Sequence, residues 1–226
     1  MNYWLVMPAA GVGRRFGGDR PKQYAALCGR TVIEWALDPF LTDPRCVGAV
    51  VALAEDDPYW TVIDLPTVVV APGGGERSHS VRNGLMALSD RAGRDDWVLV
   101  HDAARPCLPR QDLDRLLADL AAHAVGGLLA TPAADTLKRA DGSRDVQQTV
   151  DRSGLWRALT PQMFRYGRLC EALDRAHAAG RIPTDEAQAI EWLGDRPRLI
   201  EGAPANLKIT GVADLAIAAA LLKETH

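Results

Sequence analysis

The stretch YWLVMPAAGVGRRFGG, residues 3–18, leads from an apolar run directly into a loop rich in glycine and arginine. Its first part, YWLVM (3–7), is nearly continuous in apolar residues, which is typical of a strand covered on both faces of a parallel sheet. In an open α/β sheet, ligands bind beyond the carboxyl ends of the strands. We therefore expect the loop after residue 7 to lie at a binding site.

Three further apolar runs have the same character: VGAVVALA (47–54), TVVVA (67–71) and WVLVH (97–101). Helical patterns alternate with these runs, at 31–41, 78–88 and 112–123. This repeated order of strand and helix predicts an α/β fold with an open, doubly wound, mostly parallel sheet and right-handed crossovers. We expect one domain over residues 1–226.

The strand–helix order changes after residue 132. Segment 135–165 holds short β-like pieces around the turn DGSR (141–144), and Asp-Gly between such pieces predicts a hairpin. The segment has too little core of its own, so we expect it to lie on the main domain or on a second subunit. Helices are expected to resume at 166–180, 185–193 and 211–224.

The composition is ordinary for a globular protein, with 47% apolar and 24% charged residues. A net charge of −3 argues against a general nucleic-acid binder, so an anion site has to be built locally. The four cysteines form no C-x-x-C pair and are expected to be free thiols in a reducing compartment. The first apolar run is too short for a signal peptide or a membrane span, so we expect a cytoplasmic protein without a membrane partner.

The N-terminal loop fits neither of two common phosphate-binding patterns. Gly11 and Gly13 match the dinucleotide fingerprint, but Phe16 stands where its third glycine is needed, and the G-K-[ST] of a P-loop is absent. The glycines still let backbone N–H groups approach phosphate oxygens closely. Arg15 and Lys22 add positive charge, so an anion site is favoured over a solvated basic turn.

Two further stretches follow strand-like runs. In HDAARP (101–106), Asp102 is expected at the carboxyl edge of the sheet, where a carboxylate facing phosphates needs a divalent cation such as Mg²⁺ between them. The alternative is that Asp102 only caps the next helix. In PGGGERSHS (72–80), glycines permit close backbone approach, and Arg77 and Ser80 offer hydrogen bonds to a base or sugar. A flexible surface turn is equally compatible with this second stretch.

Taken together, the motifs resemble those of the 2-C-methyl-D-erythritol 4-phosphate cytidylyltransferases of the non-mevalonate isoprenoid pathway. The resemblance covers nearly the whole chain and is carried, in order, by P-A-A-G-x-G-x-R…P-K-Q-Y, G-G-x-x-R-x-x-S-V, H-D-A-A-R-P, D-R-x-G-L-W…L-T-P-Q, T-D-E-A and N-x-K-I-T. It implies a Rossmann-like nucleotidyltransferase fold with an extended β-arm. It also implies a homodimer in which the arm, residues 135–165, reaches the partner subunit.

The resemblance further implies a role for each matching residue. Arg15 and Lys22 stabilise the transition state around the α-phosphate of CTP, and Asp102 helps to bind Mg²⁺. The nucleotide is held by Pro8, Ala9, Ala10, Gly11, Gly13, Gly74, Arg77, Ser80 and Ala103. The acceptor, a small polyol phosphate, is held by Arg105, Thr136, Arg152, Thr160, Thr184 and Lys208. Ala205 departs from the pattern, because relatives often carry an acidic residue just before the asparagine of N-x-K-I-T, which is Asn206 here.

Three alternatives stay open at this point. The acceptor could be ribitol 5-phosphate or a similar polyol phosphate, because the acceptor pocket is the least specific part of the pattern. A non-catalytic nucleotide sensor could use the same scaffold, although such a protein would have no need for both Lys22 and Asp102. An NAD-linked oxidoreductase is disfavoured by Phe16 and by the basic loop.

Overall fold

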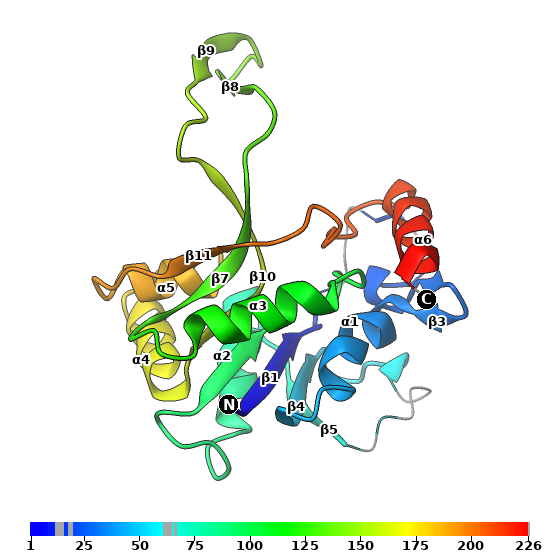
Figure 1. Cartoon of the computed structure of the whole chain (residues 1–226), viewed down its shortest axis with the longest axis vertical. Helices are drawn as coiled ribbons and strands as arrows, with labels where there is room; N and C mark the ends of the chain where they lie inside the picture. Colours follow the sequence, from blue (N-terminus) through cyan, green and yellow to red (C-terminus); the bar gives the residue numbers. More distant parts are fainter. Residues whose placement is uncertain (12–15, 18–19, 61–64, 66, 226) are drawn as a thin grey trace.

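The computed structural model of the chain describes residues 1–11, 16–17, 20–60, 65 and 67–225. A seven-stranded sheet forms its centre, in the order β11-β7-β10-β6-β1-β4-β5 (Figure 1). The strands are β1 (Tyr3–Pro8), β4 (Cys46–Leu53), β5 (Val68–Pro72), β6 (Trp97–Val100), β7 (Gly126–Pro132), β10 (Trp156–Arg165) and β11 (Arg198–Glu201). Neighbours pair in parallel except around β10, which runs antiparallel to β6 and to β7. The predicted mostly parallel α/β sheet is confirmed.

The apolar run at the N-terminus forms the central strand β1. Leu5 and Met7 belong to the core on one face of the sheet, whereas Val6 belongs to the core on the other face. All three are fully buried, because successive side chains of a strand point to opposite faces and both faces are covered. This burial explains why the run shows no alternation of apolar and polar residues.

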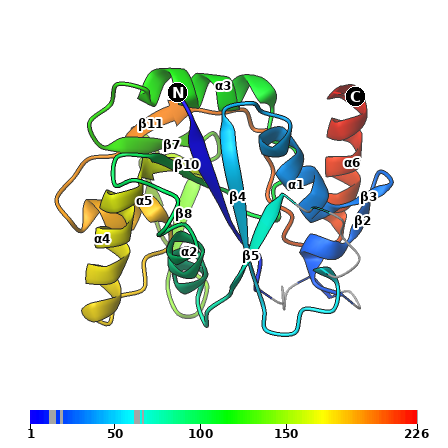
Figure 2. The ribbon, with the colours of Figure 1, turned by 90° about the horizontal axis from the view of Figure 1, so that it is seen from below.

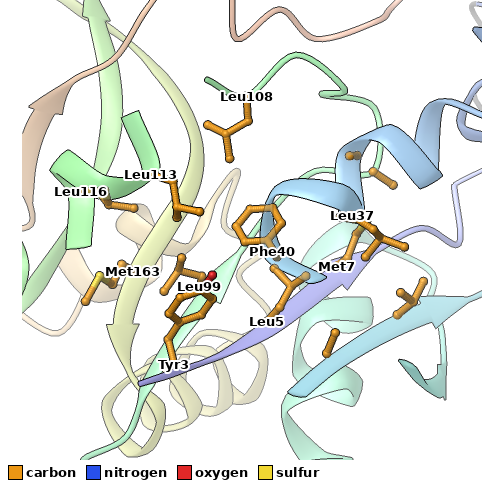
Figure 3. Packing of buried hydrophobic residues seen from close by; sticks show 14 of the residues in the cluster. Tyr3, Leu5, Met7, Leu37, Phe40, Leu99, Leu108, Leu113, Leu116 and Met163 are labelled. Carbon is orange, nitrogen blue, oxygen red and sulfur yellow. The ribbon is translucent and has the colours of Figure 1, made fainter. Parts of the chain in front are cut away.

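Helices cover both faces of the sheet (Figure 2). One face packs against α1 (Val32–Leu41) and α3 (Arg110–Leu120), whose Phe40 and Leu113 meet Leu5 and Leu99 in the core (Figure 3). The other face packs against α2 (Arg77–Met86), α4 (Tyr166–Ala178) and α5 (Glu186–Glu191). Each large apolar side chain fully buried in this way contributes about 1.5–3 kcal/mol.

Smaller elements lie beside α1. They are the 3₁₀ turn η1 (Lys22–Tyr24) and the short strands β2 (Ala26–Leu27) and β3 (Arg30–Thr31). Helix α1 begins at a capping box, in which the Thr31 hydroxyl accepts from the Glu34 N–H and the Glu34 carboxylate accepts from the Thr31 N–H. Helix α6 (Ala213–Thr225), where a helix was expected, packs here through Ala218 and Leu222.

The segment expected to form an arm divides into two parts. Strands β8 (Leu137–Ala140) and β9 (Val146–Val150) form the expected hairpin, which extends away from the body of the protein (Figure 1). From Leu159 onward the chain is buried as β10 in the central sheet, where Met163 and Phe164 belong to opposite cores. The apolar side chains of Leu159, Met163 and Phe164 explain why the exposed part ends there.

Within the residues described, no helix combines the length and the apolar character that crossing a membrane requires.

Candidate active site

A pocket of about 540 Å³ lies beyond the carboxyl ends of β1 and β6. The order of the sheet reverses between these two strands, because the chain runs from β1 outward to β4 and β5 and then returns to β6. Such a switch point is where open α/β sheets bind ligands. The pocket is lined by Pro8, Ala9, Ala10, Gly11, Lys22, Gln23, Gly74, Gly75, Glu76, Arg77, Ser80, Asp102, Ala103, Ala104 and Lys208.

The first wall of the pocket is the backbone that leaves β1. The Ala9 N–H donates to the carbonyl of Ala52 over 2.8 Å, which continues the pairing with β4 past the end of the strand. The Gln23 side chain donates to the carbonyls of Ala9 and Gly11. Lys22 lies next to this contact and donates from Nζ to the carbonyl of Ile209 over 3.0 Å.

The second wall is the glycine turn between β5 and α2. The Gly74 N–H donates to the Ser80 hydroxyl over 3.0 Å, so Ser80 ties the turn to the first turn of the helix. A Cβ atom on Gly73 would lie 2.2 Å from the Cβ of Ala10, and one on Gly74 would lie 2.3 Å from the Cβ of His79. Only glycine fits at these two positions, and the two walls therefore meet at Ala10 and Gly73.

Asp102 lies at the base of the pocket with three cationic side chains around its carboxylate. Arg77 Nε lies 2.9 Å from Oδ1, and Lys208 Nζ and Arg105 Nε lie 2.8 Å and 3.6 Å from Oδ2. Burial alone would raise the pKa of Asp102, but the charges of Arg77, Lys208 and Arg105 outweigh it and hold this pKa well below its usual range. The carboxylate is therefore ionised at neutral pH.

Arg77 joins Asp102 to a second buried carboxylate. Its Nη1 and Nη2 donate to Oε1 and Oε2 of Glu186 over 2.6 Å and 3.1 Å. Burial raises the pKa of Glu186, although the charge of the adjacent guanidinium opposes this rise. Burial alone would lower the pKa of Arg77, but the charges of Glu186 and Asp102 outweigh burial and raise it. The bidentate pair fixes the orientation of the guanidinium plane, leaving Nε for Asp102.

Behind Asp102 lies a chain of hydrogen bonds. The Asp102 N–H donates to the Thr160 hydroxyl, which lies 3.0 Å from Nδ1 of His101, while Nε2 of His101 lies 3.1 Å from the Arg105 carbonyl. Because a carbonyl only accepts, Nε2 carries the proton and Nδ1 accepts from Thr160. Burial lowers the pKa of His101 to about 4, so the ring is neutral, and its two nitrogens link the Thr160 hydroxyl to the Arg105 carbonyl.

The site residues predicted from the sequence do not all lie in the pocket. The pocket contains Pro8, Ala9, Ala10, Gly11, Lys22, Gly74, Arg77, Ser80, Asp102, Ala103 and Lys208. Arg105 and Thr160 are buried behind its base, and Thr184 is exposed two residues before Glu186. Thr136 and Arg152 are exposed on the arm, where Arg152 donates to the carbonyl of Ala134. Arg15 and Gly13 lie outside the described residues.

The predicted site residues did not include the lining residues Gly75, Glu76 and Ala104, nor two polar residues of the site, Gln23 and Glu186. Both stand inside motifs quoted for the resemblance, P-K-Q-Y and T-D-E-A. Glu186 is 109 residues from Arg77 along the chain, so no local spacing indicates their pairing. The glutamate that begins the helical pattern EAQAI, beside Ala187 and Ala189, was the available signal of a buried partner.

The side chains available as ligands determine how the pocket could bind a metal ion. Within the described residues, no group of three or more histidine, cysteine, aspartate or glutamate side chains could hold one. Among the described lining residues, Asp102 places a carboxylate at the base of the pocket and Glu76 places one at the second glycine turn, and Mg²⁺ commonly binds one or two carboxylates together with phosphate oxygens. The residues therefore fit a metal ion that takes its other ligands from a bound phosphate compound, and they do not fit a metal ion held by protein alone.

The sequence and the fold are both similar to those of one family of known proteins. A family model described as 2-C-methyl-D-erythritol 4-phosphate cytidylyltransferase matches residues 3–224. Proteins of that name from Ectopseudomonas mendocina and Pseudomonas aeruginosa are 60% and 58% identical, over 95% and 94% of this chain and 93% of each relative. The crystal structure of the Francisella tularensis protein of the same name superposes with a TM-score of 0.86 at 35% identity, covering 98% of this chain and 100% of that one.

Proposed function

Because the chain belongs to the 2-C-methyl-D-erythritol 4-phosphate cytidylyltransferase family, we propose that the pocket between its two glycine turns is the site of cytidylyl transfer. The chain transfers CMP from CTP to 2-C-methyl-D-erythritol 4-phosphate, giving 4-diphosphocytidyl-2-C-methyl-D-erythritol and pyrophosphate, in isoprenoid precursor synthesis. The observation that carries the assignment of the site is the convergence of Lys22, Asp102 and Lys208 on one pocket at the switch point of the sheet.

The nucleotide is held mainly by backbone in this proposal. Residues 8–11 and Gly13 approach the phosphates and ribose, while Gly74, Ser80 and Ala103 surround the base. Gly74 and Ser80 already share a hydrogen bond, so their polar groups have a defined direction. Arg77 contributes by holding the base of the pocket, since its Nε and both of its terminal nitrogens contact carboxylates.

The chemistry is an in-line attack of an acceptor phosphate oxygen on the α-phosphorus of CTP. A new P–O bond forms while the bond from the α-phosphorus to the bridging oxygen breaks, and pyrophosphate leaves with that electron pair. The second pKa of a phosphate monoester is ~6, so the nucleophile is mostly dianionic at neutral pH and needs no general base. The neutral, buried His101 agrees with this, because it has no free nitrogen to take a proton.

The protein must instead overcome the repulsion between two anions. Lys22 and Arg15 stabilise the charge that grows on the α-phosphate, and Lys208 draws the acceptor phosphate toward the same point. Nucleotidyltransferases generally use divalent cations, and we assign the ion to Mg²⁺ at Asp102. When bound, it would supply positive charge shared between this carboxylate and the phosphate oxygens.

The acceptor lies on the side of the pocket nearest Lys208 and Arg105. In this proposal Thr160, which lies behind the base of the pocket, and the exposed Thr184 support the acceptor from the same subunit, and Thr136 and Arg152 come from the arm of a second subunit. Support for the dimer comes from the arm itself, which exposes the apolar side chains of Leu137 on β8 and Val146 on β9. A cytoplasmic location follows from the substrates, which are phosphorylated metabolites.

The test is pyrophosphate release measured with each of the four nucleoside triphosphates. We expect release with CTP and 2-C-methyl-D-erythritol 4-phosphate in the presence of Mg²⁺, and little with ATP, GTP or UTP. Ribitol 5-phosphate is supplied in parallel as the acceptor. Faster turnover with ribitol 5-phosphate would overturn the acceptor, and no release with either acceptor would indicate a nucleotide sensor.

A further inference from the structure

The side chain of Gln23 makes contacts of its own, which differ from those of its neighbour Lys22. Its side chain is buried, with 4% of its surface exposed, and its Nε2 lies 2.8 Å from the carbonyl oxygen of Ala9 and 3.1 Å from that of Gly11. Both partners are acceptors, so the atom between them has to be the amide nitrogen. Its two hydrogens are therefore both used on the backbone of residues 8–11, which are called the first glycine turn below.

This contact fixes the direction of the backbone in that turn. The Ala9 N–H is bonded to Ala52 on β4, and the Ala9 carbonyl is bonded to Gln23, so the residue is held from both sides. In a trans peptide the carbonyl and the following N–H point in opposite directions. Holding the Ala9 carbonyl on Gln23 therefore sets the direction of the Ala10 N–H, on a residue that lines the pocket.

A second side-chain amide holds the second glycine turn in the same way. Asn83 on α2 donates from Nδ2 to the carbonyls of Pro72 and Gly73, over 3.0 Å and 3.2 Å. The Gly73 carbonyl and the Gly74 N–H belong to one peptide, and that N–H donates to Ser80. Each wall of the pocket is thus tied down by one carboxamide that bonds two carbonyls.

We propose that Gln23 and Asn83 are positioning residues, which hold the two glycine turns in their CTP-binding form before the nucleotide arrives. This inference rests on the proposed assignment of the pocket to CTP. A turn rich in small residues loses much conformational freedom when it orders around a ligand. If side chains have already ordered it, binding does not have to supply that free energy, and affinity rises.

The test compares Gln23→Met and Asn83→Leu with the unsubstituted protein. Both substitutions keep the approximate size of the side chain and remove its donors. We expect CTP affinity by calorimetry to fall about tenfold or more in Gln23→Met, because two backbone carbonyls lose their partner. Hydrogen exchange at the Ala10 and Gly11 amides of the free protein should accelerate, while the KM for the acceptor stays unchanged. Asn83→Leu should act in the same direction and more weakly, since Asn83 is half-buried.

Tyr166→Phe provides the matched control. The Tyr166 hydroxyl donates to the Leu85 carbonyl over 3.2 Å, a bond of the same kind that does not involve the glycine turns. This variant should bind CTP as the unsubstituted protein does.

The inference is overturned if Gln23→Met and Asn83→Leu bind CTP with unchanged affinity and unchanged exchange in the turns. It is also overturned if exchange accelerates throughout the protein to the same extent, since the residues would then be general stabilisers. Should Gln23→Met not fold, Asn83→Leu decides the question alone. Lys22→Ala is measured alongside: if it loses turnover while Gln23→Met keeps its affinity, this inference fails and the proposed function stands. If the unsubstituted protein binds no CTP, the proposed function fails.

Discussion

The charges around Asp102 decide how this residue behaves. Arg77 comes from α2, Arg105 follows β6, and Lys208 lies near the C-terminus, yet all three reach one carboxylate. Their combined charge outweighs the effect of burial, so Asp102 is a permanent anion at neutral pH. Together with Lys22 they also make the base of the pocket cationic, which suits a triphosphate.

Lys22 is the described residue whose loss should affect turnover most directly. Lys22→Ala is expected to lower kcat on the order of 10²–10³-fold, because a fixed charge at the reacting phosphate is removed. Its hydrogen bond to Ile209 contributes only about 0.5–1.5 kcal/mol, so the fold should survive. Pyrophosphate release and a thermal melt measure both quantities. Near-normal turnover in a folded variant would contradict the catalytic role, and the same experiment applies to Arg15→Ala.

The pairing of Arg77 with Glu186 should appear as a coupling energy in protein stability. Glu186→Gln leaves the Arg77 guanidinium without one of its buried partners, and breaking such a pair costs about 3–5 kcal/mol. The double variant Arg77→Met with Glu186→Gln should lose less than the sum of the two single variants, Arg77→Met and Glu186→Gln. Urea unfolding of the four proteins gives the coupling. Additive losses would mean that the two side chains stabilise the fold independently.

At the scale of elements, the sequence predicted well what local patterns determine. The runs at 3–7, 47–54 and 97–101 became β1, β4 and β6, because strands buried on both faces are continuous in apolar residues. The antiparallel insertion of β10 between β6 and β7 was not predicted, since strand order depends on contacts between distant segments. The same holds at the site. Asp102 was expected at a strand end, but the sequence could not show that Arg77 and Lys208 contact its carboxylate, because they are distant in the chain.

The arm is the element on which the proposed dimer depends. Val146 on β9 is 62% exposed, and Val70 on the edge strand β5 is 49% exposed, so Val70 is a suitable control site for a substitution at Val146. Val146→Asp should shift the protein from dimer to monomer in light scattering, because a carboxylate would be buried at the interface. Val70→Asp should leave the mass unchanged. A dimer that persists in Val146→Asp at the concentration of the unsubstituted protein would contradict this use of the arm.

At the scale of the whole molecule, two helical layers on one sheet leave the carboxyl ends of β1 and β6 open for the pocket. Beside these layers, the thiol of Cys107 is buried against α6, and this should make stability depend on pH. Burial, with a smaller contribution from Cys28, raises the pKa of Cys107 to about 11 from an ordinary value of 9.0. As pH rises, the unfolded chain loses this proton first, so the stability that the buried thiol contributes is present below pH 9 and is lost as pH approaches 11.

Cys107→Ala isolates this contribution from those of other groups. The free energy of unfolding of the unsubstituted protein should fall relative to that of the variant between about pH 8 and about pH 11, by no more than about 2–3 kcal/mol. Urea unfolding at several pH values measures the difference. A constant difference over this range would mean that the thiol titrates alike in the folded and unfolded chains.

The most direct measurement is a crystal structure of the protein with CTP and Mg²⁺. We expect cytosine against Gly74 and Ser80, the triphosphate along residues 8–11 with Lys22 at the α-phosphate, and one metal ion between the phosphates and the Asp102 carboxylate. A nucleotide bound in this pocket whose metal ion does not contact Asp102, or a nucleotide bound elsewhere on the protein, would contradict the proposed site.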